Sequence, residues 1–156
     1  MRLTEILTRD RVQLANPSDG IRTKPDVLEL LARMLAFGAG ENAAQIGRAL
    51  EAREVLGSTG IGDSVAIPHG FVDTLDRRTA ALFLCPDGVD FAAADGRPAS
   101  IFVGLVGPRR ESGEHLRTLA AITRLLRSEA FRQKLLASPD AATAFRAIAQ
   151  EEEAVP

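Results

Sequence analysis

Two histidines are the side chains of this sequence best suited to chemistry near neutral pH. One of them, His69, closes the short apolar run from Val65 to Pro68 and follows the small, polar segment from Ser58 to Gly62. A neutral imidazole is nucleophilic near pH 7 and forms covalent intermediates. His69 is therefore a candidate nucleophile, and a purely structural histidine after an Ile-Pro pair is the alternative.

The segment before His69 has the composition of an anion-binding loop. Gly60 and Gly62 let backbone N–H groups approach an anion because they lack a Cβ, and Ser58 and Thr59 add hydroxyl donors. The segment lacks the Gly-Lys-Ser/Thr of a Walker loop and the glycine spacing of a dinucleotide fingerprint. Ser58, Thr59 and Gly60 are therefore candidate ligands of a phosphate that a side chain carries. A loop that only reverses the chain is the alternative.

Two more residues can contribute to such a site. His115 lies at the start of a predicted helix, where a donor in the first turn and the helix N-terminus favour an anion. Arg53 precedes the loop and can place a guanidinium on the same oxygens. The alternatives are a surface helix position for His115, and for Arg53 either an ion pair with Glu51 or Glu54 or a solvated side chain.

Helical patterns lie at both ends of the chain. Thr23, Pro25 and Asp26 predict a helix start, and apolar residues at helical spacing continue that helix to the glycines at 38–40. A second helix is predicted over 42–55. In the last third, helices are predicted over 116–126, over 131–135 after a break near 128, and beyond 138, with Ser138 as N-cap and Pro139 at the first helical position.

Apolar runs in the middle of the chain predict strands. Residues 64–67, 79–85 and 100–106 are β-prone, and the two longer runs are nearly continuous, which is typical of strands covered on both faces. Pro68 and Gly70 favour a position for His69 at a strand end near the surface. We therefore expect a single-domain α/β sandwich over residues 1–150 and a disordered polar tail over 151–156.

Composition excludes several classes of function. The net charge of −2 and the pI of about 5.7 argue against a nucleic-acid surface, so Arg77-Arg78 and Arg109-Arg110 are interpreted as solvated loops. Cys85 is interpreted as a buried hydrophobe. Two histidines without a nearby thiolate do not make a tetrahedral metal site. The lack of a long apolar stretch or signal-peptide core predicts a cytoplasmic protein without membrane insertion.

The candidate residues lie in stretches that closely resemble a known family, the fructose/mannitol-type (type 2) enzyme IIA domain of the bacterial phosphoenolpyruvate-dependent phosphotransferase system. The matching stretches are RE at 53–54, GSTGIG at 57–62, VAIPHG at 65–70, and GEHL at 113–116 running into AITRLLR at 121–127. The resemblance extends from about Leu3 to Ile148 and implies a mixed β-sheet between helices. The chain begins near the start of the domain and ends just after it, and so looks most like the free-standing, nitrogen-related branch of the family.

The resemblance also implies residue roles. His69 would be phosphorylated on Nε2, His115 would donate to the phosphoryl group, and Arg53 would help to hold the anion. Ser58 and Thr59 would line the loop. Ser64 departs from the family, where glycine is common, and we expect its Cβ to be tolerated in a strand.

A phosphocarrier without metal or cofactor is the function that the resemblance implies. A phosphohistidine on a small HPr-like donor protein would pass its phosphoryl group to His69. In the nitrogen-related branch the phosphorylation state regulates partners such as ion transporters or sensor kinases, and this is the function we expect. The alternatives are transport, in which a IIB domain receives the group, and a non-enzymatic binding module, against which the two histidines argue.

Overall fold

The protein is described by a computed structural model over residues 1–40 and 42–154. Within these residues the helices are α1 (Lys24–Ala36), α2 (Ala43–Val55), α3 (Ser112–Leu125), α4 (Glu129–Leu136) and α5 (Ala141–Ala154). The strands are β1 (Val12–Leu14), β2 (Gly60–Gly62), β3 (Val65–Ala66), β4 (His69–Phe71), β5 (Thr79–Val89) and β6 (Ala99–Gly107). Short 3-10 helices lie at Leu3–Glu5 (η1), Arg9–Arg11, Pro17–Asp19 and Arg109–Glu111.

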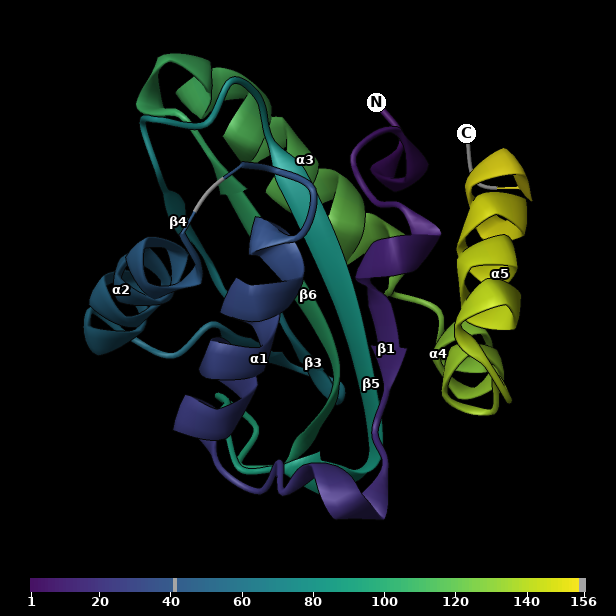
Figure 1. The fold of residues 1–156 in the computed structure, drawn as a ribbon. Helices are drawn as coiled ribbons and strands as arrows, with labels where there is room; N and C mark the ends of the chain where they lie inside the picture. The colour runs from purple at the N-terminus through teal and green to yellow at the C-terminus, as the bar shows by residue number, and fades with distance from the viewer. Residues whose placement is uncertain (41, 155–156) are drawn as a thin grey trace.

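A mixed six-stranded sheet forms the centre of the fold (Figure 1). Its order is β1-β5-β6-β3-β2, and β4 also pairs with β6. β5 and β6 are antiparallel, whereas β1 runs parallel to β5, and β3 and β4 run parallel to β6. β3 and β4 follow each other along β6, with Ala66 opposite Phe102 and His69 opposite Leu105. The expected mixed sheet flanked by helices is confirmed.

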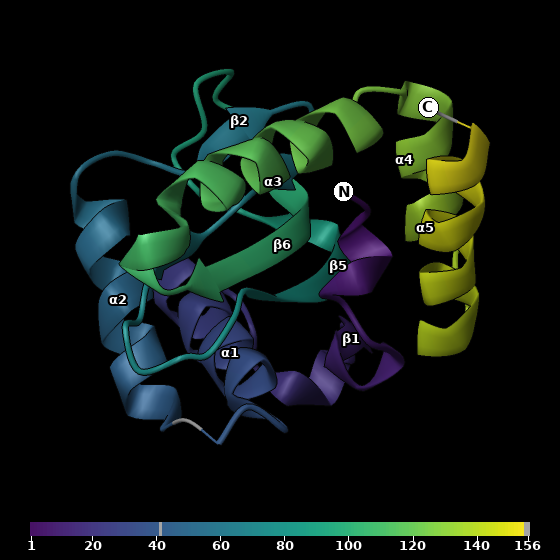
Figure 2. The ribbon, with the colours of Figure 1, turned by 90° about the horizontal axis from the view of Figure 1, so that it is seen from above.

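Helices cover both faces of the sheet (Figure 2). α1 and α2 pack on one face over a core that contains Phe83 and Phe102. α3, α4 and α5 pack with η1 on the other face, over a core that contains Leu82 and Leu105. Alternate residues of β5 and β6 therefore enter different cores, which explains why their apolar character is nearly continuous. None of the helices in the described residues has the length and apolar composition needed to cross a membrane.

Local capping signals set the starts of α1 and α2 where the sequence predicted them. Thr23 and Asp26 form a capping box, in which the Thr23 side chain accepts from the Asp26 N–H and Asp26 accepts from the Thr23 N–H. The Asn42 side chain accepts from the Ala44 N–H, at 2.7 Å. These two helices carry the residues that hold the loop beside His69.

The C-terminal helix differs from the sequence prediction at both ends. The Asp140 carboxylate accepts a hydrogen bond of 2.7 Å from the Thr143 N–H, so Asp140 rather than Ser138 caps α5. At the other end, the Glu152 carboxylate accepts hydrogen bonds from the first two backbone N–H groups of η1, those of Leu3 and Thr4. Residues 151–154 belong to α5 and are helical, so the expectation of a disordered tail is wrong for them. Residues 155–156 of that expected tail lie outside the described residues.

The turn between β2 and β3 holds Ser64 in an unexpected conformation. Gly62 lies opposite Val65, so Asp63 and Ser64 form a two-residue hairpin loop, with φ values of 56° and 69°. Two successive positive φ values define a type I′ turn, in which Asp-Gly is strongly favoured because a Cβ is strained at the second position. The expectation that Ser64 lies in a strand and tolerates its Cβ there is therefore wrong.

Replacing Ser64 by glycine should stabilise the protein by about 0.5–1 kcal/mol. Relief of the left-handed strain, about 1–2 kcal/mol, outweighs the extra entropy of the unfolded chain, about 0.4–1 kcal/mol. Equilibrium unfolding in urea measures the change. Ser112→Gly is the matched control because Ser112 has an ordinary φ of −58°, and it should destabilise the protein. Equal destabilisation by both substitutions would contradict the assigned turn.

Candidate functional site

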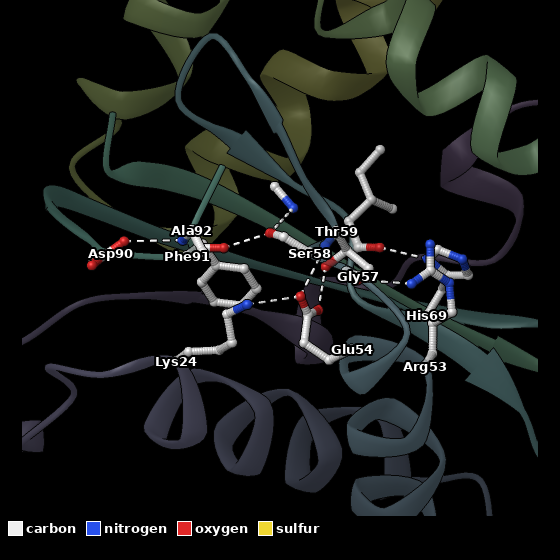
Figure 3. A network of polar contacts seen from close by, with 12 residues as sticks. Lys24, Arg53, Glu54, Gly57, Ser58, Thr59, His69, Asp90, Phe91 and Ala92 are labelled. Carbon is white, nitrogen blue, oxygen red and sulfur yellow. Dashed lines mark hydrogen bonds and ion pairs between the residues drawn. The ribbon is translucent and has the colours of Figure 1, made fainter. Parts of the chain in front are cut away.

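His69 begins β4 and lies half-buried beside the loop over 57–60 (Figure 3). Its Nδ1 is 2.7 Å from the carbonyl oxygen of Ile67. A carbonyl oxygen only accepts, so Nδ1 carries the proton and donates it. The other ring nitrogen, Nε2, then bears the lone pair. The backbone therefore holds this imidazole in the tautomer with a nucleophilic Nε2.

The surroundings of His69 keep the ring neutral. Burial lowers its pKa below the ordinary 6.5. The hydrogen bond to Ile67 opposes that shift, the positive charge of Arg53 adds to it, and the charge of Glu54 opposes it again. At neutral pH the side chain is consequently unprotonated at Nε2 and able to attack an electrophile.

Close packing against α2 fixes the position of β4. A Cβ on Gly70 would lie 2.9 Å from the Ala49 carbonyl oxygen, so only glycine allows this approach. Successive side chains of a strand point to opposite faces. Gly70 faces α2, and its neighbours His69 and Phe71 face α3, where both rings pack near His115.

Arg53 lies beside His69, as its sequence position suggested. It is on the last turn of α2, and its Nη1 donates to the Gly57 carbonyl oxygen at 2.9 Å. Figure 3 shows its guanidinium next to the His69 ring. The alternative of an ion pair with Glu54 is not what the structure shows, because that carboxylate bonds to Lys24 at 2.9 Å. Arg53 brings a positive charge to the nucleophile.

The loop residues Ser58, Thr59 and Gly60 bond within the protein. The Ser58 hydroxyl donates to the Phe91 carbonyl oxygen at 2.5 Å and accepts from the Gly60 N–H at 3.0 Å. The Thr59 N–H and hydroxyl both donate to Glu54, at 2.8 and 2.6 Å. These contacts give the loop its shape. Phosphate binding by these three residues stays a prediction.

His115 occupies the first turn of α3 and is brought to His69 across the edge of the sheet. The ring centroids of the two histidines are 5.6 Å apart, and that of Phe71 lies 4.6 Å from the His115 ring. His115 is 4% exposed, and neither ring nitrogen has a hydrogen-bond partner among the described residues. A buried imidazole without partners costs free energy, and such a cost is common at functional sites.

Electrostatics keep His115 neutral as well. Burial lowers its pKa to about 4, and the neighbouring His69 and Arg78 add to the shift. Arg78 lies against Gly107, where a Cβ would be 2.8 Å from its Cγ, and pairs with Glu111 at 2.9 Å. Its side chain is only 15% exposed. The interpretation of Arg77-Arg78 as a solvated loop is therefore wrong for Arg78, because its ion pair spans two segments distant in sequence.

The shifted pKa of His115 predicts a pH-dependent stability. Between about pH 6.5 and 4 the unfolded chain binds a proton that the folded protein excludes, so stability falls as the pH falls through this window. The shift corresponds to about 3 kcal/mol. Wild type should lose about that much free energy of unfolding relative to His115→Phe between pH 7 and pH 4. Parallel pH profiles for the two proteins, measured by urea unfolding, would contradict a buried neutral imidazole.

Comparison with known proteins identifies the family. A family model described as phosphoenolpyruvate-dependent sugar phosphotransferase system, EIIA 2, matches residues 5–151. The chain belongs to this family. The resemblance of the stretches around His69 and His115 to an enzyme IIA domain is therefore confirmed. The chain is an EIIA component of a phosphotransferase system.

The similar proteins include nitrogen regulatory proteins and a sugar-specific EIIA component. A nitrogen regulatory protein of Pseudomonas aeruginosa is 36% identical, over 95% of each chain. A fructose-specific EIIA component of Haloferax volcanii is 33% identical, over 87% of this chain and 89% of its own. The crystal structure of the nitrogen regulatory protein IIA-Ntr from Neisseria meningitidis superposes with a TM-score of 0.85 at 30% identity, covering 92% and 97% of the two chains.

Glu54 and Phe71 are residues at this EIIA site that sequence reasoning did not select. Glu54 was considered only as an ion-pair partner of Arg53, although a buried acid beside a polar loop can organise that loop. Phe71 lies two residues beyond His69, and the alternation of a strand puts both on one face. The alternation could not be used from the sequence alone, because the sequence pattern did not predict the short strand β4.

Proposed function

We propose that this chain is a histidine phosphocarrier that accepts a phosphoryl group from an HPr-like phosphohistidine donor onto Nε2 of His69. The observation that carries the proposal is the 2.7 Å contact between His69 Nδ1 and the Ile67 carbonyl oxygen. It leaves a neutral Nε2 on a half-buried ring, next to a guanidinium and a second imidazole. Membership of the EIIA 2 family supports the same chemistry.

The transfer balances without an added base. The lone pair of His69 Nε2 attacks phosphorus while the bond from phosphorus to the donor nitrogen breaks. A donor ring that carries a proton on its other nitrogen leaves as neutral imidazole. The His69 ring keeps its Nδ1 proton, which remains bonded to Ile67, and takes up the positive charge of the phosphorylated ring. Catalysis is then positioning and electrostatics.

Two side chains meet the charge of the phosphoryl oxygens in this proposal, and a loop holds its place beside them. Arg53 supplies a guanidinium, which suits phosphate geometry. His115, neutral at physiological pH, supplies one N–H donor from a buried position. Ser58, Thr59 and Gly60 shape the loop beside these two groups, because the Ser58 hydroxyl, both donors of Thr59 and the Gly60 N–H bond within the protein. Direct phosphate binding by these three residues would require those bonds to exchange. The unpartnered nitrogens of His115 support this role, since a phosphoryl group on His69 would satisfy a donor that the protein leaves unpaired.

Exposed apolar side chains next in sequence to Arg53 and His115 suit a protein donor. Val55 and Leu56 follow Arg53 and are 85% and 83% exposed, and Leu116 follows His115 and is 66% exposed. Exposed large apolar residues that gather around polar groups mark interaction surfaces. A docked donor would cover them and exclude water from the transfer.

We propose further that the phosphorylated state regulates partner proteins such as ion transporters or sensor kinases. Relatives named nitrogen regulatory protein support this function. Phosphorylation adds about −2 of charge, enough to change partner binding at this surface. Sugar transport, with onward transfer to a IIB domain, is the second candidate, and the fructose-specific EIIA relative favours it.

Reconstitution with enzyme I, the donor protein and phosphoenolpyruvate tests both steps. We expect the intact mass to rise by one acid-labile phosphoryl group. Adding candidate IIB domains should then leave most of that group on the chain, and affinity capture with wild type and His69→Asp should recover different partners. Rapid, complete transfer to a IIB domain would favour transport instead, and absence of labelling would reject the phosphocarrier.

A further inference from the structure

Glu54 is a buried carboxylate at the centre of a polar network (Figure 3). The residue is 9% exposed and accepts three hydrogen bonds. Lys24 Nζ and the Thr59 N–H donate to Oε2 at 2.9 and 2.8 Å, and the Thr59 hydroxyl donates to Oε1 at 2.6 Å. Such a buried charge persists only when a cation and several donors satisfy it. Lys24 is that cation, and the two donors of Thr59 complete the set.

The network continues through the backbone to His69. The Thr59 carbonyl oxygen accepts from the Ile67 N–H at 3.0 Å. The Ile67 carbonyl oxygen in turn lies 2.7 Å from His69 Nδ1. Three hydrogen-bonded contacts, joined by the backbone of Thr59 and Ile67, therefore link Glu54 to the proton that decides which nitrogen of His69 is nucleophilic.

Glu54 and Arg53 hold the two ends of the same loop. Arg53 donates to Gly57, and its neighbour Glu54 accepts from Thr59. Helix α2 is itself placed by α1, since Lys24 comes from the first position of that helix. The position of the loop relative to His69 therefore depends on this one carboxylate and its cation.

We propose that Glu54 is a positioning residue for phosphoryl transfer. Through Thr59 and Ile67 it holds the His69 ring with Nδ1–H inward and Nε2 outward, and the 2.9 Å contact with Lys24 fixes the carboxylate in place. The effect on rate rests on the proposed phosphocarrier function, whereas the effect on the ring does not. The negative charge of Glu54 also raises the pKa of His69, whereas the positive charge of Arg53 lowers it, so the two charges act against each other at this ring.

The tautomer of His69 and the rate of transfer together test this proposal. In the full-length chain with ¹⁵N-labelled histidine, ring NMR should show one Nδ1–H tautomer for wild-type His69. Glu54→Gln should give a mixture of tautomers and should lower the rate of phosphoryl acceptance by about tenfold to a hundredfold, the range for small misplacements of a reacting group. Thr59→Val should change both in the same direction, and Thr59→Ser should restore them.

Two controls separate positioning from general stability. Glu51→Gln makes the same chemical change on an exposed position of α2 and should leave tautomer and rate unchanged. Leu135→Ala removes packing in the core beneath α4 and should lower the melting temperature without changing the His69 tautomer.

The outcomes are distinguishable. A Glu54→Gln protein with a single Nδ1–H tautomer, or one that transfers as fast as wild type, overturns the positioning role. If Glu54→Gln does not fold, the Thr59 pair decides by the same criteria. If wild type accepts no phosphate, the proposed function fails, and the tautomer measurement still decides whether Glu54 orients the ring.

Discussion

His69→Gln should abolish phosphoryl acceptance, leaving no acid-labile mass increase after incubation with enzyme I, the donor and phosphoenolpyruvate. Glutamine approximates the reach of histidine, but its amide nitrogen has no lone pair available for attack on phosphorus. The loss should be complete because no second nucleophile replaces Nε2: the other imidazole, His115, is 4% exposed. Intact-mass spectrometry measures the result.

The fold should survive this substitution. His69 is half-buried at the start of a strand, and Gly70, not His69, makes the close contact with α2. Circular dichroism and the melting temperature should therefore remain near those of wild type. Labelling of a folded His69→Gln protein to wild-type extent would place the phosphoryl group on another residue.

His115→Phe should slow phosphoryl acceptance by about a hundredfold to a thousandfold, the usual cost of removing one donor to a developing anion. The phenyl ring keeps the packing against Phe71 but offers no N–H. The same change should raise the free energy of unfolding at pH 7 by about 1 kcal/mol, because two buried, unpartnered nitrogens disappear. Single-turnover transfer and urea unfolding measure the two effects.

The opposite signs of these effects make the test specific. A residue that served only packing would lose stability and rate together. His115→Asn, which keeps an N–H donor, should recover part of the rate. A His115→Phe protein that is as fast as wild type would show that the second imidazole does not contact the phosphoryl group.

Features that depend on neighbours in sequence were predictable. The start of α1 was fixed by Thr23 and Asp26, which contact each other across one turn. The strands β5 and β6 were indicated by long apolar runs because both faces of the sheet are covered. The residue types of His69, Arg53 and the loop suggested an anion-binding site. The resemblance to enzyme IIA domains then favoured that interpretation over a purely structural one.

Features that depend on distant contacts were not predictable. β2 and β4 have three residues each, too few for a period to show, and they form only because β3 and β6 pair with them. The burial of Arg78 follows from Glu111 and the missing side chain of Gly107, which no local pattern signals. The burial of Glu54 likewise depends on a contact with a lysine on another helix.

The most direct test of the account is a phosphorus–nitrogen correlation NMR experiment on the phosphorylated chain with ¹⁵N-labelled histidine. We expect a one-bond coupling between phosphorus and Nε2 of His69, with the proton still on Nδ1. Phosphorus bonded to Nδ1 of His69, to His115, or to neither ring would contradict the geometry on which the account depends.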